Sequence, residues 1–218
     1  IVSFVEYDCM GRSDSIVYLP YVTKSQSIIF RQNPLSEQTN FYQNIYAYDN
    51  KEYDRNYPFA AKEYDKSNMG LVMKQGSSGL MYQLNSHPKE YEYGFNGPWG
   101  EVKKYSVTES GTLNYKGSYP EKSLTTKITK QPVTDFEKSI LIEYYDANEN
   151  LIAREQHISM QDRRITYYIY DDLGHLRYVL PPSANIQATT SPDQLPEDCF
   201  YYEYDEYNHI CKQYIPCL

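Results

Sequence analysis

The sequence lacks the features of a membrane-spanning or nucleic-acid-binding protein. Its apolar runs reach only about five residues, whereas a membrane-spanning helix needs roughly 20. The N-terminus has neither the basic residues nor the apolar core of a signal peptide. The formal net charge is −8, and the Lys and Arg residues are scattered, so the sequence offers no basic stripe to neutralise phosphates. We therefore expect no membrane span and no nucleic-acid partner.

Because the sequence starts without Met and in the middle of an expected strand, we expect a piece of a longer protein.

Metal and thiol motifs are equally scarce. The four cysteines form no Cys-x-x-Cys pair and have no His at zinc-ligand spacing. They are Cys9, Cys199, Cys211 and Cys217. The last three lie close enough in sequence for one disulfide, and free, partly buried thiols are the favoured alternative. His175 and His209 occupy equivalent places in two hairpins, which repetition explains without a metal. We expect no metal site and no cofactor.

Tyrosine is the residue that the sequence has in excess. Of 218 residues, 26 are Tyr, against 7 Phe and 1 Trp. Tyr favours pleated, half-buried surfaces, where its ring packs and its hydroxyl stays wet. This composition indicates sheets with at least one partly solvated face. The predicted fold class is all-β, with antiparallel hairpins in a twisted, curved sheet, long irregular loops and minimal helix.

The clearest predicted hairpin spans residues 166–182. Alternation along both arms gives each strand one apolar face, with Tyr167 and Ile169 together on the incoming arm. Between the arms, the segment from Asp171 to Gly174 suits a type I turn that is closed by a left-handed glycine. Two prolines then stop the outgoing strand at Pro181, because proline cannot donate to a ladder.

Weaker copies of this Tyr-Asp-x-x-Gly turn recur along the chain. Each follows one strand-forming segment and precedes another, and the position four after the Tyr holds Gly or Asn in most copies. One copy has Glu149 there, and we expect Asn148 or Asn150 to take its left-handed backbone role. The residues expected to shape these turns are Tyr7, Asp8, Gly11, Tyr64, Asp65, Asn68, Tyr145, Asp146, Tyr170, Asp171, Gly174, Tyr204, Asp205 and Asn208.

Signals between the repeats are weaker. Residues 40–58 carry Tyr48-Asp49 and Tyr53-Asp54 without a following Gly or Asn, and we interpret them as loop or weak strand. Residues 101–107 and 123–130 are predicted strands, and residues 25–130 are expected to supply a smaller satellite sheet. Residues 183–197 are a polar connector, in which Ser191-Pro192-Asp193 predicts one short helical turn.

The repeated hairpin resembles the bacterial RHS, or YD, repeat. The resemblance is strongest in the segments TYYIYDDLGHLRYVLPP (166–182) and FYYEYDEYNHICKQYIP (200–216). Residues 5–19 and 142–154 resemble the domain of unknown function that precedes such arrays in large bacterial surface proteins. The resemblance covers essentially the whole chain and is loose between residues 25 and 130.

This resemblance implies a structural role. RHS repeats wind into a β-sheet shell that encloses a C-terminal effector, and a chain of this length would form or seed part of that shell. The chain would belong to a secreted or surface-exposed bacterial protein, with further RHS repeats or the effector of the same polypeptide as its partners. We expect residues 1–182 to form a β-rich domain that ends in a Tyr-Asp hairpin. Residues 183–218 would add a connector and the next hairpin, packed with it as one unit.

The sequence contains no recognisable catalytic set, so we expect a non-enzymatic protein. The segment from Asp146 begins like an EF-hand calcium loop, but Leu151 stands where that loop needs Gly. Gly76-Ser77-Ser78-Gly79 lacks the nucleophile elbow of a serine hydrolase. The neighbouring carboxylates Asp171 and Asp172 are interpreted as solvated turn residues.

A carbohydrate- or cell-wall-binding module is the main alternative. Aromatic rings that are exposed on a β face can stack on sugars, while nearby Asp, Asn and Glu bind the hydroxyls. Tyr91, Tyr93, Trp99 and Tyr105 lie in a region rich in Gly and Asn and are the candidates for such a platform. Packing across strands explains the same residues structurally.

Overall fold

The chain is described by a computed structural model and contains two compact units. The first unit comprises Ile1–Tyr91 with Lys130–Lys138, and the second comprises Glu92–Thr129 with Ser139–Leu218. The structure describes residues 1–23, 31–45, 56–67, 69–97, 102–132, 138–158, 162–184, 186 and 188–215. Tyr48-Asp49, Tyr53-Asp54, Asn68, Trp99 and Cys217 therefore lie outside the described residues. Across the described ranges, no helix has the length and apolarity to cross a membrane.

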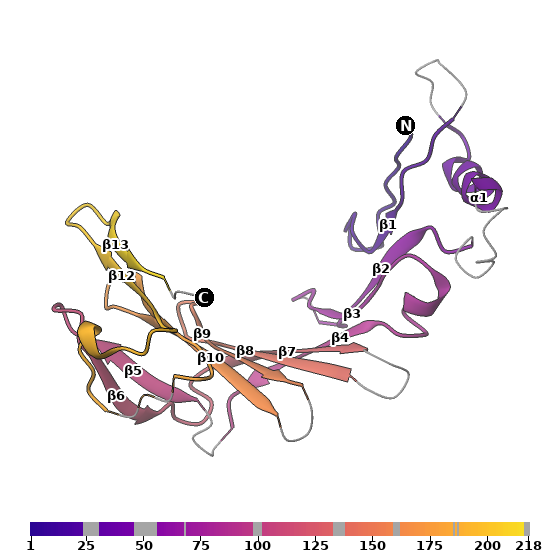
Figure 1. Ribbon diagram of the computed structural model, residues 1–218. Helices are drawn as coiled ribbons and strands as arrows, with labels where there is room; N and C mark the ends of the chain where they lie inside the picture. Colours follow the sequence, from indigo (N-terminus) through magenta and orange to yellow (C-terminus); the bar gives the residue numbers. More distant parts are fainter. Residues whose placement is uncertain are drawn as a thin grey trace. The chain divides into compact units, whose positions relative to one another are not determined.

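The first unit is built on antiparallel strands in the order β1-β2-β3-β4 (Figure 1). Its elements are β1 (Ile16–Tyr18), α1 (Pro34–Ile45), β2 (Phe59–Tyr64), β3 (Val72–Gly76), the 3-10 turn η2 (Leu80–Tyr82) and β4 (Lys89–Phe95). Residues 92–95 of β4 belong to the second unit.

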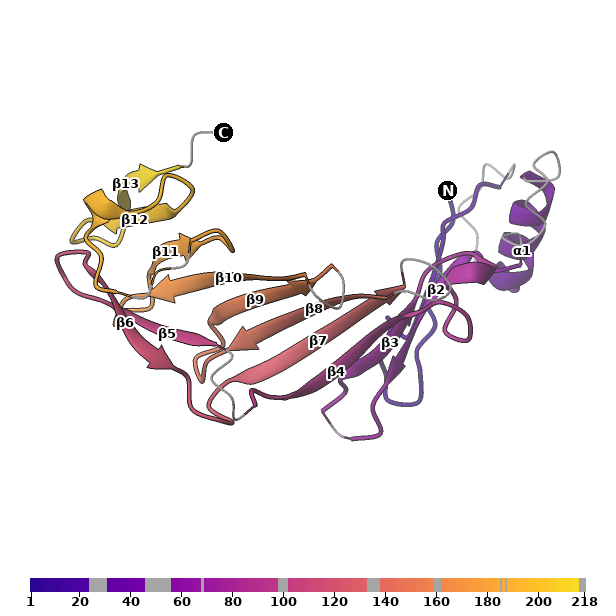
Figure 2. The same cartoon turned by 60° about the horizontal axis from the view of Figure 1, so that its bottom comes forward.

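The second unit holds a run of neighbouring strands that follow their order in the sequence, from β7 to β13 (Figure 2). They are β7 (Thr125–Pro132), β8 (Lys138–Tyr145), β9 (Leu151–His157), β10 (Arg163–Tyr170), β11 (Leu176–Leu180), β12 (Phe200–Tyr204) and β13 (Ile210–Tyr214). Residues 130–132 of β7 and Lys138 of β8 belong to the first unit. The described pairings among β8 to β13 are all antiparallel. Each Tyr-Asp turn in this unit thus joins two adjacent strands, which confirms the predicted all-β fold of hairpins.

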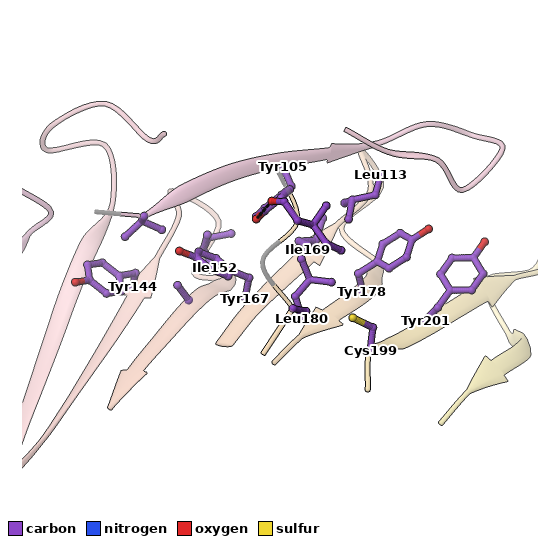
Figure 3. Close-up of a cluster of buried hydrophobic side chains, with 14 of the residues drawn as sticks. Tyr105, Leu113, Tyr144, Ile152, Tyr167, Ile169, Tyr178, Leu180, Cys199 and Tyr201 are labelled. Atoms are coloured by element: carbon purple, nitrogen blue, oxygen red, sulfur yellow. Dashed lines mark hydrogen bonds between the residues drawn. The ribbon is translucent and has the colours of Figure 1, made fainter. Parts of the chain in front are cut away.

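A two-stranded sheet of β5 (Lys103–Val107) and β6 (Leu113–Ser118) covers one face of these strands (Figure 3). Tyr105 on β5 meets Tyr167 on β10 edge-on, with ring centroids 5.6 Å apart, and its hydroxyl donates to the Ile186 carbonyl at 2.9 Å. Leu113 on β6 exchanges two backbone hydrogen bonds with Thr190, so the connector is tied to the small sheet. This pair of strands is the satellite sheet expected between residues 25 and 130.

The core of the second unit lies between the small sheet and the larger one. Its buried residues are Val102, Tyr105, Leu113, Leu124, Tyr144, Ile152, Ala153, Tyr167, Ile169, Tyr178, Leu180, Ala184, Ile186, Cys199 and Tyr201. Five of these are tyrosines, and the Tyr178 hydroxyl donates to the Gly111 carbonyl. Buried hydroxyls that find carbonyl acceptors explain how a Tyr-rich sequence builds a core, because an unpaired buried hydroxyl is costly.

Helix α1 corrects the interpretation of residues 40–58 as loop or weak strand, because residues 40–45 are helical. Pro34 occupies the start of the helix, where its missing N–H is not needed. The fully buried Gln38 amide donates to the Pro58 carbonyl at 3.2 Å, and the Tyr42 hydroxyl donates to the Pro20 carbonyl at 2.7 Å. Polar side chains attach this helix to distant segments, so the sequence carries no regular apolar stripe to reveal it.

The structure lacks the strand expected before the first turn and contains the short helical turn expected in the connector. Residues 3–7 form no strand before the first turn, and Val2 makes only an isolated bridge with Tyr21. The short turn η3 (Pro192–Gln194) confirms the helical turn predicted from Ser191-Pro192-Asp193. The residue range 183–218 lies inside the second unit, together with the strands that precede it.

Candidate functional site

The turn after β10 is held together by a single aspartate. One carboxylate oxygen of Asp171 accepts the N–H groups of Leu173 at 3.1 Å and of His175 at 2.9 Å. The backbone closes the same turn, because Gly174 N–H donates to the Asp171 carbonyl and Asp171 N–H donates to the His175 carbonyl, both at 3.0 Å. Asp171 therefore satisfies turn amides that neither strand can pair.

The same bonds recur at three other aspartates. Oδ1 accepts the N–H two residues on and the N–H four residues on, at 2.9 Å in every case. The residues are Asp8 with Met10 and Arg12, Asp146 with Asn148 and Asn150, and Asp205 with Tyr207 and His209. Sequence similarity among these turns thus reflects one hydrogen-bonding pattern.

The fourth residue after each Tyr takes the left-handed backbone. Its φ is +77° at Gly11, +64° at Glu149, +84° at Gly174 and +64° at Asn208. The expectation that Asn148 or Asn150 would replace Glu149 was wrong, because Glu149 itself adopts this conformation. The turn's bonds impose it there at the cost of strain that Gly avoids.

The turn at Asp65 is longer than the others. The Asp65 carboxylate accepts the N–H of Leu71, six residues on, at 2.9 Å, and Asp65 N–H donates to the Leu71 carbonyl at 2.8 Å. Gly70 takes a left-handed conformation in this turn, with φ +65°. The extra residues between Asp65 and the returning strand explain why the spacing of the other turns fails here.

In the second unit, the tyrosine before each turn aspartate marks a shift in strand register. Tyr145, Tyr170 and Tyr204 each pair with the residue six positions on, and the register slips directly before each Tyr. A slip of this kind is a bulge, which bends the strand and increases its local twist. Each Tyr therefore lies at a fixed place beside the turn.

The second carboxylate oxygen of each turn binds the side chain four residues on. Asp8 Oδ2 pairs with Arg12 Nε at 2.7 Å, and Asp146 Oδ2 accepts the Asn150 amide at 3.1 Å. The corresponding Nδ1 atoms of His175 and His209 lie 3.3 Å and 3.5 Å from Oδ2 of Asp171 and Asp205. The aspartate thus orients the side chain that closes each turn, ahead of the returning strand.

That oriented side chain contacts the tyrosine of the next turn in two places. The His175 ring stacks on Tyr204 with centroids 4.7 Å apart, and the Tyr204 hydroxyl donates to the Leu176 carbonyl at 3.0 Å. In the first unit, the Arg12 guanidinium lies 3.8 Å from the centre of the Tyr64 ring. In these two places, one turn is therefore linked to a later turn by a contact between a nitrogen-bearing side chain and a tyrosine ring.

These bonds lower the pKa of three turn carboxyl groups, those of Asp8, Asp171 and Asp205. The Arg12 N–H is the main cause at Asp8, and the His209 N–H is the main cause at Asp205. At Asp171 burial raises the pKa, but the His175 N–H and the Arg177 guanidinium outweigh it, and the pKa falls. These three aspartates therefore favour the ionised form, which accepts more hydrogen bonds.

One family model matches the first part of the chain. Residues 1–95 match the model of a domain of unknown function (DUF6443). The matched segment contains the first two Tyr-Asp turns, at Asp8 and Asp65. No match was found among the curated proteins.

Two cavities of the second unit lie between successive turns. One, of about 310 Å³, is lined by Asp146, Asn150, Tyr170 and Asp171 among others. The other, of about 390 Å³, includes Asp171, Asp205 and Asn208 in its lining. Within the described ranges, no three His, Cys, Asp or Glu residues are placed to hold a metal ion. Each cavity thus has residues of two successive turns in its lining.

A buried polar cluster on β8, β9 and β10, centred on Glu155, was not predicted from the sequence. Glu155 has a 2% exposed side chain and accepts the Tyr144 hydroxyl and an Arg163 N–H, both at 2.9 Å. His157 also contacts its carboxylate. Because three partners satisfy this charge, it can remain buried in the sheet. Glu155 lies two residues after Ala153 on β9, so the alternation of a strand places both on the same buried face. The sequence does not show which residues of other strands are its partners.

The candidate sugar-stacking residues do not share one environment. Tyr105 is 8% exposed and belongs to the core, so its ring cannot receive a ligand from solvent. The Tyr91 hydroxyl donates to Gln75 at 2.9 Å in the first unit. Tyr93 is 39% exposed on β4, and Phe95, which sequence reasoning did not select, is 61% exposed.

Proposed function

We propose that this chain is a non-catalytic structural β module of a secreted or surface-exposed RHS/YD-repeat protein. Its hairpins would form or seed a β-sheet shell, with further repeats or a C-terminal effector of the same polypeptide as partners. The observation that carries the proposal is the repetition of one turn, with the same bonds to Asp8, Asp146, Asp171 and Asp205.

A structural role fits the positions of the polar residues. The turn aspartates direct their carboxylates to their own backbone and to the side chain four residues on, which uses their acceptors for folding. Each hairpin then places its returning strand beside the incoming strand of the next, as β9 lies beside β10 and β11 beside β12. This arrangement extends a sheet by addition of like units.

The alternative is carbohydrate binding, and it now depends on Tyr93, one of the original candidates, together with Phe95. Tyr93 and Phe95 are two apart on β4, so their side chains lie on one face of the strand. Loss of retention on glycan gels in a Tyr93→Ala, Phe95→Ala double variant would favour this alternative. Equal mobility of both proteins with and without glycan would count against it.

The reading frame beyond the codon for Leu218 tests the structural proposal. Further Tyr-Asp-x-x-Gly units in the same polypeptide are the expected result, because each hairpin needs a neighbour to cover its edge. A stop codon directly after Leu218 would contradict a role in seeding a larger shell.

A further inference from the structure

Strand β13 has one edge that the described residues leave open. It pairs with β12 on its other side, and all five of its residues are exposed. Ile210 and Tyr214 are 54% and 46% exposed on this strand. An edge strand that carries large apolar side chains is a site where another strand can add.

The other hairpins show what lies beside a returning strand. Beside β11 lies β12, which ends in Tyr204 and Asp205. Tyr204 stacks on His175 and donates its hydroxyl to the Leu176 carbonyl. Beside β9 lies β10, which ends in Tyr170 and the next turn aspartate. In both of these hairpins the neighbour of the returning strand is thus a strand that leads into a Tyr-Asp turn, whereas β4, which lies beside the returning strand β3, ends in Phe95.

His209 stands in β13's hairpin where His175 stands in the preceding one. Both follow the left-handed residue, both donate their N–H to the turn aspartate at 2.9 Å, and both direct Nδ1 to its second oxygen. The His209 side chain is 78% exposed, against 20% for His175, which Tyr204 covers. Asp205 therefore holds the His209 ring in an orientation that suits a tyrosine.

We propose that the open edge of β13 and His209 form a docking site for a β-strand that ends in Tyr-Asp, whose tyrosine ring stacks on the His209 imidazole. This inference rests on the proposed function and names the feature by which the next hairpin is recognised. The Ile210 carbonyl, equivalent to that of Leu176, accepts the incoming tyrosine hydroxyl. The occupant is a further hairpin of the same kind.

A second copy of this chain fits the site less well. The described strands that end in Tyr-Asp are β2, β8, β10 and β12, and each already has a neighbour on both sides. The segment before Tyr7 forms no strand. The part of a folded copy that the structure describes therefore offers no free strand of the required kind.

The experiment uses the full chain and a cyclised peptide with the sequence of residues 166–182. Titration should show saturable binding, and hydrogen exchange should show slower exchange of the amides of residues 210–214. His209→Ala in the chain, or Tyr170→Ala in the peptide, should each weaken binding about two- to tenfold, as expected for the loss of one aromatic contact. His87→Ala in the chain and Tyr168→Ala in the peptide are the matched controls and should change the affinity less.

The outcomes separate this inference from the proposed function. Binding that is equally tight with His209→Ala and Tyr170→Ala would overturn recognition through the tyrosine, yet would leave a sheet-building role intact. Absence of saturable binding, or unchanged exchange of residues 210–214, would overturn the docking site itself. Sedimentation that shows the chain associating with itself through β13 would assign the edge to a second copy and also overturn the proposal.

Discussion

The His175 ring lies on the Tyr204 ring with centroids 4.7 Å apart and planes inclined by 23°. These residues belong to successive turns, so one contact joins two hairpins that are separated by a long connector. The imidazole is held from behind by Asp171, which also closes its own turn. Turn geometry and contact between hairpins thus depend on the same carboxylate.

Acid should weaken this arrangement through Asp171. Its pKa is lowered in the folded state, so its contribution to stability is complete above the unfolded value near 3.8 and is lost as the pH falls through the lower folded value. We expect the free energy of unfolding to decline below about pH 4. Asp171→Asn should make this decline shallower when it is measured by urea unfolding at several pH values. Asp172→Asn is the matched control, and an equal effect of both changes would refute the assignment.

Glu149→Gly should stabilise the protein. Glu149 holds φ +64°, a conformation that costs a residue with a Cβ roughly 1 kcal/mol more than it costs Gly. We expect a gain of about 0.5–1 kcal/mol in the free energy of unfolding, since added freedom of the unfolded chain offsets part of the relief. Asn208→Gly should gain less, because Asn tolerates this region. A loss of stability with Glu149→Gly would show that its side chain contributes more than the strain costs.

Gly111→Ala should destabilise the second unit. Gly111 has φ +81°, and a Cβ there would collide with the Tyr201 hydroxyl. Gly117, with φ +89°, has open space around the same position, so Gly117→Ala measures the backbone strain alone. We expect Gly111→Ala to cost about 1–3 kcal/mol more than Gly117→Ala in chemical unfolding. Equal costs would mean that Tyr201 moves aside freely.

Glu155→Gln should show how much the buried cluster contributes to the free energy of unfolding. The change leaves the Arg163 charge without its partner and disturbs the bond from Tyr144. Because Arg163 is 40% exposed, we expect a loss of about 1–3 kcal/mol, below the cost of breaking a fully buried pair. Glu143→Gln breaks the pair with the more exposed Arg154 and should cost under about 1 kcal/mol. Thermal unfolding of both variants decides the comparison.

The thiols should differ in reactivity. Burial, together with the charge of Asp198, raises the pKa of Cys199 to about 12, whereas Cys9 and Cys211 are exposed free thiols. At pH 8 a thiol reagent should label Cys9 and Cys211 in the folded chain and Cys199 only after unfolding, because the thiolate is the reactive form. Peptide mapping identifies the labelled sites. Rapid labelling of Cys199 in the folded protein would indicate local opening of the core.

Local features of the fold were predictable from the sequence. The bonds of Asp171 reach no further than Arg177, six residues on, so composition and spacing over a few residues encode the turn. The alternation that places Tyr167 and Ile169 on the buried face is equally local. Helix α1 depends on bonds from Gln38 to Pro58 and from Tyr42 to Pro20, and no local pattern announces them.

The failures at the candidate site have the same physical origin. Tyr105 was a candidate for sugar stacking in the carbohydrate alternative, but it packs against Tyr167 and donates to the Ile186 carbonyl, which lie far along the chain. The partners of Glu155 come from three strands. In each case a contact between distant segments decided the environment of the side chain.

The turns at Asp8, Asp146, Asp171 and Asp205 close their backbone bonds within five residues, and this has a consequence for how such a chain can change over generations. Duplication or deletion of a whole hairpin removes none of these backbone bonds from the turns on either side, because each runs from the Asp carboxylate to the N–H four positions on. Recombination at the connectors can therefore lengthen or shorten the protein one hairpin at a time, while every remaining turn keeps its geometry.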